Sequence, residues 1–151
     1  MKIKKLQTAS FVSSAAANHK TQKGMVINMT IQECYQKFGG DYDEVKKRLP
    51  SDALIKKFIV KFLDDSSFSN LFIAMKEGSR ERAFAAAHTL KGVCSNLGMN
   101  KLAFSASKLT DLLRPQTESI PEGADVLFEE VRCDHESTAS IICAFLDQEN
   151  H

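Results

Sequence analysis

Hydrophobic residues recur every three or four positions along most of this chain, which is the spacing of one face of an α-helix. Glycine and proline lie almost wholly between these runs, where they would separate one helix from the next. The pattern predicts helices at about 30–38, 43–48, 52–64, 68–77, 80–97, 100–114 and 122–148. Ser67 and Ser79 are expected to cap two of them, and Gly78 and Gly98 to end two.

β-Strand signals are missing from the sequence, because β-branched residues are sparse and no segment alternates polar with apolar positions. We therefore predict an all-α fold, an antiparallel four-helix bundle with a short N-terminal helical extension. Residues 29–150 are expected to form the folded domain. Residues 1–28 carry five lysines and no acid, and we interpret them as a basic, disordered leader, because their apolar stretch is too interrupted for a secretory signal.

Composition excludes several classes of protein. The hydrophobic share of 43% and the charged share of 26% are typical of a globular chain. No apolar run approaches the roughly 20 residues that span a bilayer, so we expect no membrane association. The body is mildly acidic, which argues against nucleic-acid binding. The four cysteines show no zinc spacing, so we expect reduced thiols, no metal and a cytoplasmic protein. A complete core makes a monomer the default.

The segment 79–97 carries the strongest functional signal. Its apolar positions are spaced 4, 3, 4 and 3 residues apart, which makes one core-facing seam: Ala83, Ala87, Leu90, Cys94 and Leu97. At about 100° per residue, His88 points roughly 140° away from the centre of that seam. We therefore predict that His88 faces solvent.

The neighbours of His88 argue against an incidental surface histidine, which is the alternative. Lys91 lies one turn further along and can reach a group attached to the imidazole. Glycine at position 92 lowers the stability of an exposed helix by about 1 kcal/mol relative to alanine. Because it has no side chain, Gly92 would leave space for a partner. Phe84 and Ser95 share this face and are candidate docking residues.

The string from Ala87 to Gly98, AHTLKGVCSNLG, resembles the signature of histidine phosphotransfer (HPt) domains, in which lysine and glycine follow the histidine by three and four residues. The resemblance implies that His88 accepts a phosphoryl group from the aspartyl phosphate of a receiver domain and passes it to another receiver. It also implies that Lys91 stabilises the transferred charge and Gly92 admits the partner. The dimerisation helix of a sensor kinase usually has an acidic residue and then a proline after its histidine, whereas Thr89 and Val93 stand there.

This resemblance implies a phosphoryl carrier rather than a true enzyme. We expect no kinase activity, because the sequence holds no glycine-rich phosphate loop. We expect no cofactor, since the divalent metal of such a reaction would sit on the receiver. Two alternatives stay open: a helical adaptor that binds a receiver without carrying phosphate, and a purely structural bundle.

The last helix is expected to bury one stripe and to leave His135 at the surface or the bundle edge. The stripe comprises Leu127, Val131, Thr138, Ile141 and Phe145.

Overall fold

A computed structural model describes residues 28–149 of the chain, and this part is all-helical with no strand. The predicted leader falls almost entirely outside the described residues. The helices follow in the order α2 (Ile31–Lys37), α3 (Tyr42–Arg48), α4 (Asp52–Leu63), α5 (Ser67–Glu77), α6 (Arg80–Asn96), α7 (Asn100–Leu113) and α8 (Ala124–Glu149). The all-α prediction is confirmed, and the predicted bounds agree to within about two residues.

Local sequence explains most of the helix ends. Thr30 and Glu33 form a reciprocal capping box at the start of α2, and the Ser79 hydroxyl accepts a hydrogen bond from the Arg82 backbone N–H. Gly78 ends α5 in the left-handed conformation at φ 72°. The prediction for Ser67 was wrong. Ser67 is the buried first residue of α5, and its backbone N–H donates to the Asp65 carboxylate.

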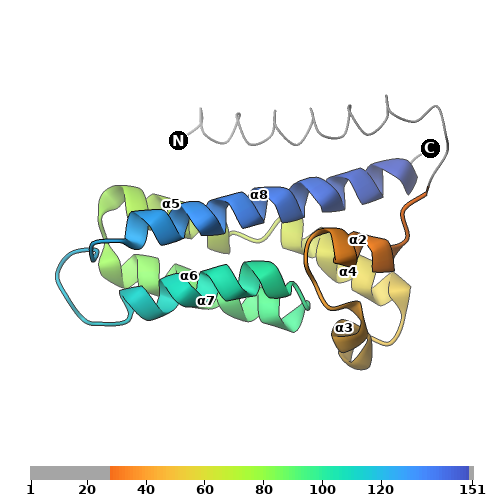
Figure 1. Cartoon of the computed structure of the whole chain (residues 1–151), viewed down its shortest axis with the longest axis horizontal. Coiled ribbons are helices and arrows are strands. Elements are labelled where there is room, and N and C mark those ends of the chain that lie inside the picture. The colour runs from red at the N-terminus through yellow and green to blue at the C-terminus, as the bar shows by residue number, and fades with distance from the viewer. Residues whose placement is uncertain (1–27, 150–151) are drawn as a thin grey trace.

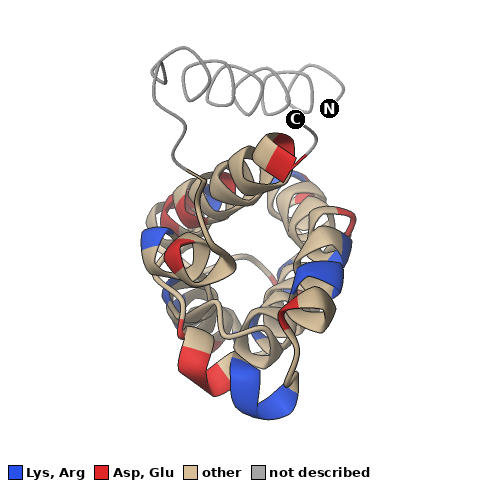
Figure 2. Cartoon of the chain, turned by 90° about the vertical axis from the view of Figure 1, so that its right-hand side faces the viewer, with Lys and Arg blue, Asp and Glu red and all other residues tan. Residues whose placement is uncertain are grey.

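Helices enclose the core of the bundle on four sides, here called walls (Figures 1 and 2). Helices α6, α7 and α8 each form one wall. Helix α6 packs against both α5 and α7, and α7 packs against α8. The fourth wall is built from α4 and α5 in succession. Near opposite ends of α8, Phe68 of α5 stacks on Phe128, and Lys56 of α4 pairs with Glu149. The predicted antiparallel four-helix bundle is confirmed, with one wall broken at residues 64–66.

The N-terminal extension, α2 and α3, closes one end of the bundle at the turn between α6 and α7. The Tyr35 hydroxyl donates to the Leu97 carbonyl at 2.7 Å, and the Asp41 N–H donates to the Gly98 carbonyl at 2.8 Å. A Cβ on Gly40 would lie 2.7 Å from that same Gly98 oxygen, so only glycine fits this close approach. The extension therefore fixes the C-terminal end of α6.

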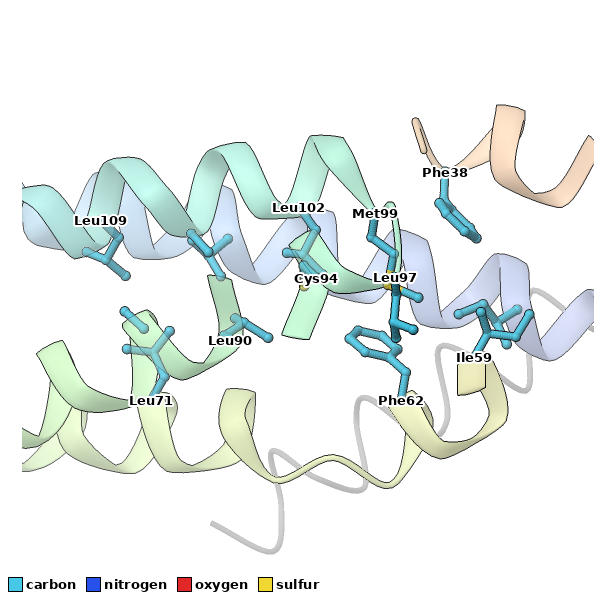
Figure 3. Close-up of a cluster of buried hydrophobic side chains, with 14 of the residues drawn as sticks. Phe38, Ile59, Phe62, Leu71, Leu90, Cys94, Leu97, Met99, Leu102 and Leu109 are labelled. Atoms are coloured by element: carbon cyan, nitrogen blue, oxygen red, sulfur yellow. The ribbon is translucent and has the colours of Figure 1, made fainter. Parts of the chain in front are cut away.

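The core is a continuous apolar cluster that runs the length of the bundle. Figure 3 shows Leu71, Leu90, Leu102 and Leu109 pointing toward one another from α5, α6 and α7. The stripe predicted for α8 was partly wrong, because Phe128 and Ile142 are buried while Leu127 and Ile141 are only partly buried. Helix α8 contacts α2 and α4 as well as α7, so its apolar face is wider than one stripe.

Basic and acidic residues are interspersed along the helices of the bundle (Figure 2). No helix among the described residues is long and apolar enough to cross a membrane. All four cysteines are free thiols: Cys34 and Cys94 are buried in the core, Cys143 is partly buried and Cys133 is exposed. Burial raises the pKa of the Cys34 thiol to about 12, so this thiol stays protonated.

Candidate functional site

Hydrogen bonds between arginine side chains and backbone carbonyls tie both ends of helix α6 to other elements. At its start, the buried Arg80 guanidinium donates to the carbonyls of Leu113 at 2.6 Å and Thr117 at 2.9 Å. At its end, Arg48 of α3 donates to the carbonyls of Ser95 and Asn96. The carbonyls of Ser95, Asn96 and Leu113 lie at helix ends, where carbonyls lack partners within the helix, and the two arginines satisfy them. The central turns of α6 therefore have a fixed position in the bundle.

The two faces of α6 differ as predicted. Ala83, Ala87, Leu90 and Cys94 have no solvent exposure, which confirms the core-facing seam. Three buried alanines in the first half of the helix, Ala83, Ala86 and Ala87, allow the neighbouring helices to approach closely, since small side chains shorten the distance between helix axes. His88 lies on the opposite side and is exposed, which confirms its predicted orientation.

The His88 imidazole is free for chemistry. Among the described residues it makes no hydrogen bond and no ion pair, and its ring contact is with Phe84. The two rings are nearly parallel, at 17°, with their centroids 5.9 Å apart. Both nitrogens of the imidazole are therefore available, one as a lone-pair nucleophile and the other as an N–H donor.

The space beside His88 is open on the Gly92 side. A Cβ built on Gly92 would meet no atom within 4 Å, so nothing inside the described part of the chain requires glycine there. Lys91 is partly buried and has no ion-pair partner among residues 28–149. An open notch and an uncommitted ammonium group thus flank the imidazole, and both suit an anionic group brought by a second molecule.

The other predicted site residues lie in different relations to His88. Phe84 is partly buried, and the Arg114 guanidinium at the end of α7 lies over its ring, 5.5 Å from the centroid. Ser95 is exposed but two turns further along α6, about 10 Å by helix rise. Its hydroxyl is too distant to reach a group on the imidazole, which leaves it a candidate for partner contact only.

Sequence reasoning missed two arginines near the site, Arg48 and Arg114. Both come from other helices, so no spacing within α6 reveals them. The position of Arg114 beside Phe84 could have been inferred from the tight turn at Gly98. Such a turn makes α6 and α7 an antiparallel hairpin, which brings residues near 114 beside residues near 84. Arg48 carries no comparable local signal.

A shallow groove of about 360 Å³ lies beside α6, on the side of the fourth wall. Its lining is mostly apolar and includes Phe58 and Phe62 of α4 together with Val93 and Leu97. Arg48 and Lys61 contribute positive charge to the lining and Asp65 negative charge. The groove meets α6 at Val93, Asn96 and Leu97, in the last turns of the helix beyond His88.

The surface position considered for His135 was wrong. Its ring lies at the bundle edge but is turned inward, stacked on Phe68 with centroids 4.3 Å apart. Its Nδ1 atom is shielded from solvent and has no hydrogen-bond partner within the described part of the chain. Burial lowers the pKa of His135 to about 4, with Asp65 opposing the shift, so the ring is neutral at pH 7.

No cluster of histidine, cysteine or acidic side chains that could hold a metal ion occurs among residues 28–149. A model of the Hpt domain family matches residues 59–138, which is more than half of the chain. The match covers the helix that carries His88 and the helices on either side of it. Comparisons with curated proteins and with solved structures give no match.

Proposed function

Because this chain belongs to the Hpt domain family, whose members act in phosphotransfer in two-component signalling, we propose that His88 is its phosphoryl acceptor. It receives the phosphoryl group from the aspartyl phosphate of one receiver domain and passes it to the aspartate of another. The observation that carries the proposal is an exposed imidazole without an internal hydrogen bond, beside an open glycine and an uncommitted lysine.

The transfer requires one nucleophilic displacement in each direction. The lone pair of one imidazole nitrogen forms the N–P bond while the P–O bond of the aspartyl phosphate breaks, and its electron pair leaves with the partner's carboxylate. The proton on the second ring nitrogen exchanges with solvent. Return transfer reverses these steps on another receiver, so the protein ends unchanged and acts as a carrier.

Two neighbours of His88 serve this step. The Lys91 ammonium stabilises negative charge on the phosphoryl oxygens, which is the largest electrostatic demand of such a reaction. Gly92 lets the partner's aspartate and its surrounding loops approach the imidazole in line, since a side chain there would stand in the approach path. A divalent metal ion, where the reaction uses one, belongs to the receiver.

The docking surface of this proposal is the exposed face of α6 together with the adjacent groove. Ser95 contributes a polar contact, and the partly buried Phe58 and Val93 contribute apolar area. A surface that is apolar at its centre and charged at its rim is typical of transient protein contacts. We expect the carrier to act as a monomer, with receivers as its partners.

The test is transfer of labelled phosphate from a phosphorylated receiver to the purified protein. We expect an acid-labile, base-stable label on the wild-type chain and on a His135→Phe control, and no label on His88→Gln. Circular dichroism of each variant verifies folding. Labelling of His88→Gln at the wild-type level would overturn the assignment.

A phosphate-independent adaptor predicts a different outcome. In that case His88→Gln would bind receivers as tightly as the wild type, and no phosphohistidine would form with any receiver of the host. Binding measured by calorimetry alongside the label therefore separates a carrier from an adaptor.

A further inference from the structure

We propose that Phe84 and Arg114 are positioning residues, which together form a stacked support that orients the His88 imidazole. This inference rests on the proposed role of His88 as phosphoryl acceptor and deepens it. The support consists of the nearly parallel rings of Phe84 and His88 and of the Arg114 guanidinium over the Phe84 ring.

An exposed histidine needs such a support because its side chain would otherwise sample several rotamers. In-line attack requires one nitrogen lone pair aimed at phosphorus, and an error of about 1 Å in such an alignment can cost two orders of magnitude in rate. Within residues 28–149, His88 has no hydrogen bond that could select a rotamer. The ring contact with Phe84 is therefore the interaction that restrains it.

Phe84 can act as a support because it is itself held in place. It precedes His88 by four residues, so the two side chains lie one above the other on the same helix. Its ring is partly buried and packs against the hydrophobic core. An exposed docking side chain would lack this restraint.

Arg114 closes the support from a second helix. Its guanidinium lies 5.5 Å from the centroid of the Phe84 ring, and its Nη2 donates to the Asp111 carboxylate at 3.1 Å. A cation over an aromatic face is attracted by the negative potential of the ring's π-electrons, so the contact restrains the Phe84 ring. Because Arg114 caps α7 while Phe84 belongs to α6, the contact ties the imidazole to the hairpin and not only to its own helix.

A positioning role differs from a docking role in two measurable ways. Support for the imidazole exists in the free protein, so its loss changes the His88 ring before any partner binds. It also acts on the maximal transfer rate, whereas a docking contact acts on the receiver concentration that gives half of that rate.

The experiment uses the full chain with Phe84→Leu, Arg114→Ala and Arg114→Lys. The control is Arg82→Ala, which removes an arginine of α6 that pairs with Glu77 on the other flank. Single-turnover transfer from a phosphorylated receiver is followed over a range of receiver concentrations. In parallel, NMR of the unphosphorylated protein records the ring resonances of His88.

We expect Phe84→Leu and Arg114→Ala each to lower the maximal transfer rate roughly three- to tenfold, which is the change expected from the loss of one ring or cation–π contact. The half-saturating concentration should stay within about twofold, and the His88 ring resonances should move toward those of an unstructured peptide. Arg114→Lys keeps the cation and should recover most of the rate, and Arg82→Ala should match the wild type.

An altered half-saturating concentration with unmoved His88 resonances would overturn the proposal and make Phe84 a docking residue. Unchanged kinetics in both Phe84→Leu and Arg114→Ala would also overturn it. If the wild-type chain accepts no phosphate at all, the proposed function fails, and the NMR measurement still decides whether the support orients the ring.

Discussion

His88 and His135 place the same side chain in opposite surroundings. His88 stands on the outer face of α6, with an open notch at Gly92 and no hydrogen bond within the described residues. His135 of α8 faces inward, stacked on Phe68, with Nδ1 shielded from solvent. Both rings contact a phenylalanine, yet only one of them can be reached by a second protein.

The difference shows that access, more than residue type, decides which histidine can serve in phosphotransfer. A nucleophile for a phosphoryl group on another protein must present a lone pair at the surface. His135 cannot do so without opening the contact between α5 and α8, and its low pKa reflects the loss of water around the ring. Its ring contributes to packing and makes stability depend on pH.

The largest expected effect concerns His135 and pH. The unfolded chain binds a proton at His135 near pH 6.5, whereas the folded chain does so only near its pKa of about 4. The stability of the fold should therefore be fully present above pH 6.5 and should fall between pH 6.5 and 4. This residue should account for up to about 3 kcal/mol of that loss.

Urea unfolding at pH 7 and pH 4.5 measures this dependence, with His135→Phe as the matched variant. Phenylalanine keeps a ring against Phe68 and cannot bind the proton, so its loss of stability in acid should be smaller. Equal losses in the two proteins would show that other groups, such as the carboxylates, cause the pH dependence.

The next effect concerns the notch at Gly92. Gly92→Gln should lower the transfer rate on the order of 100-fold, because the added side chain stands where the partner must approach. The same substitution should raise the free energy of unfolding by about 0.5–1 kcal/mol, since glutamine favours the helix and a Cβ at this position meets no atom. Activity and stability should thus change in opposite directions.

Gly92→Ala serves as the graded control, measured by the same labelling and urea experiments. It should show the gain in stability with a smaller loss of transfer. A loss of stability in either variant would mean that Gly92 serves the packing of the bundle and not the approach of a partner.

The smallest effect concerns Lys91. Lys91→Ala should slow transfer about tenfold, because one partly buried cation at the protein surface is still partly screened by salt and water, while stability stays within about 0.5 kcal/mol. Lys57→Ala, on the exposed side of α4, is the matched control for the loss of a positive charge. Equal rates for the two variants would reduce Lys91 to an ordinary solvated lysine.

Much of the fold could be predicted because helix phase and helix ends are local properties. The seam of α6 and the cap at Ser79 follow from residues within a few positions of one another. Ser67 was misassigned because Ser66 directly precedes it and Asp65 bonds the Ser67 backbone N–H, so three adjacent polar residues competed for the helix start. The inward turn of His135 was missed because the sequence does not state which side of α8 meets α5.

The amino-acid sequence by itself determined that His88 faces away from the core and that Lys91 and Gly92 share its surroundings, because positions on one helix are related by a fixed rotation. Only the tertiary structure decided that Arg114 covers Phe84, that Arg48 fixes the end of α6, and that His135 is enclosed by aromatic rings. These contacts join residues distant in sequence, and they depend on how the helices pack together rather than on any local pattern.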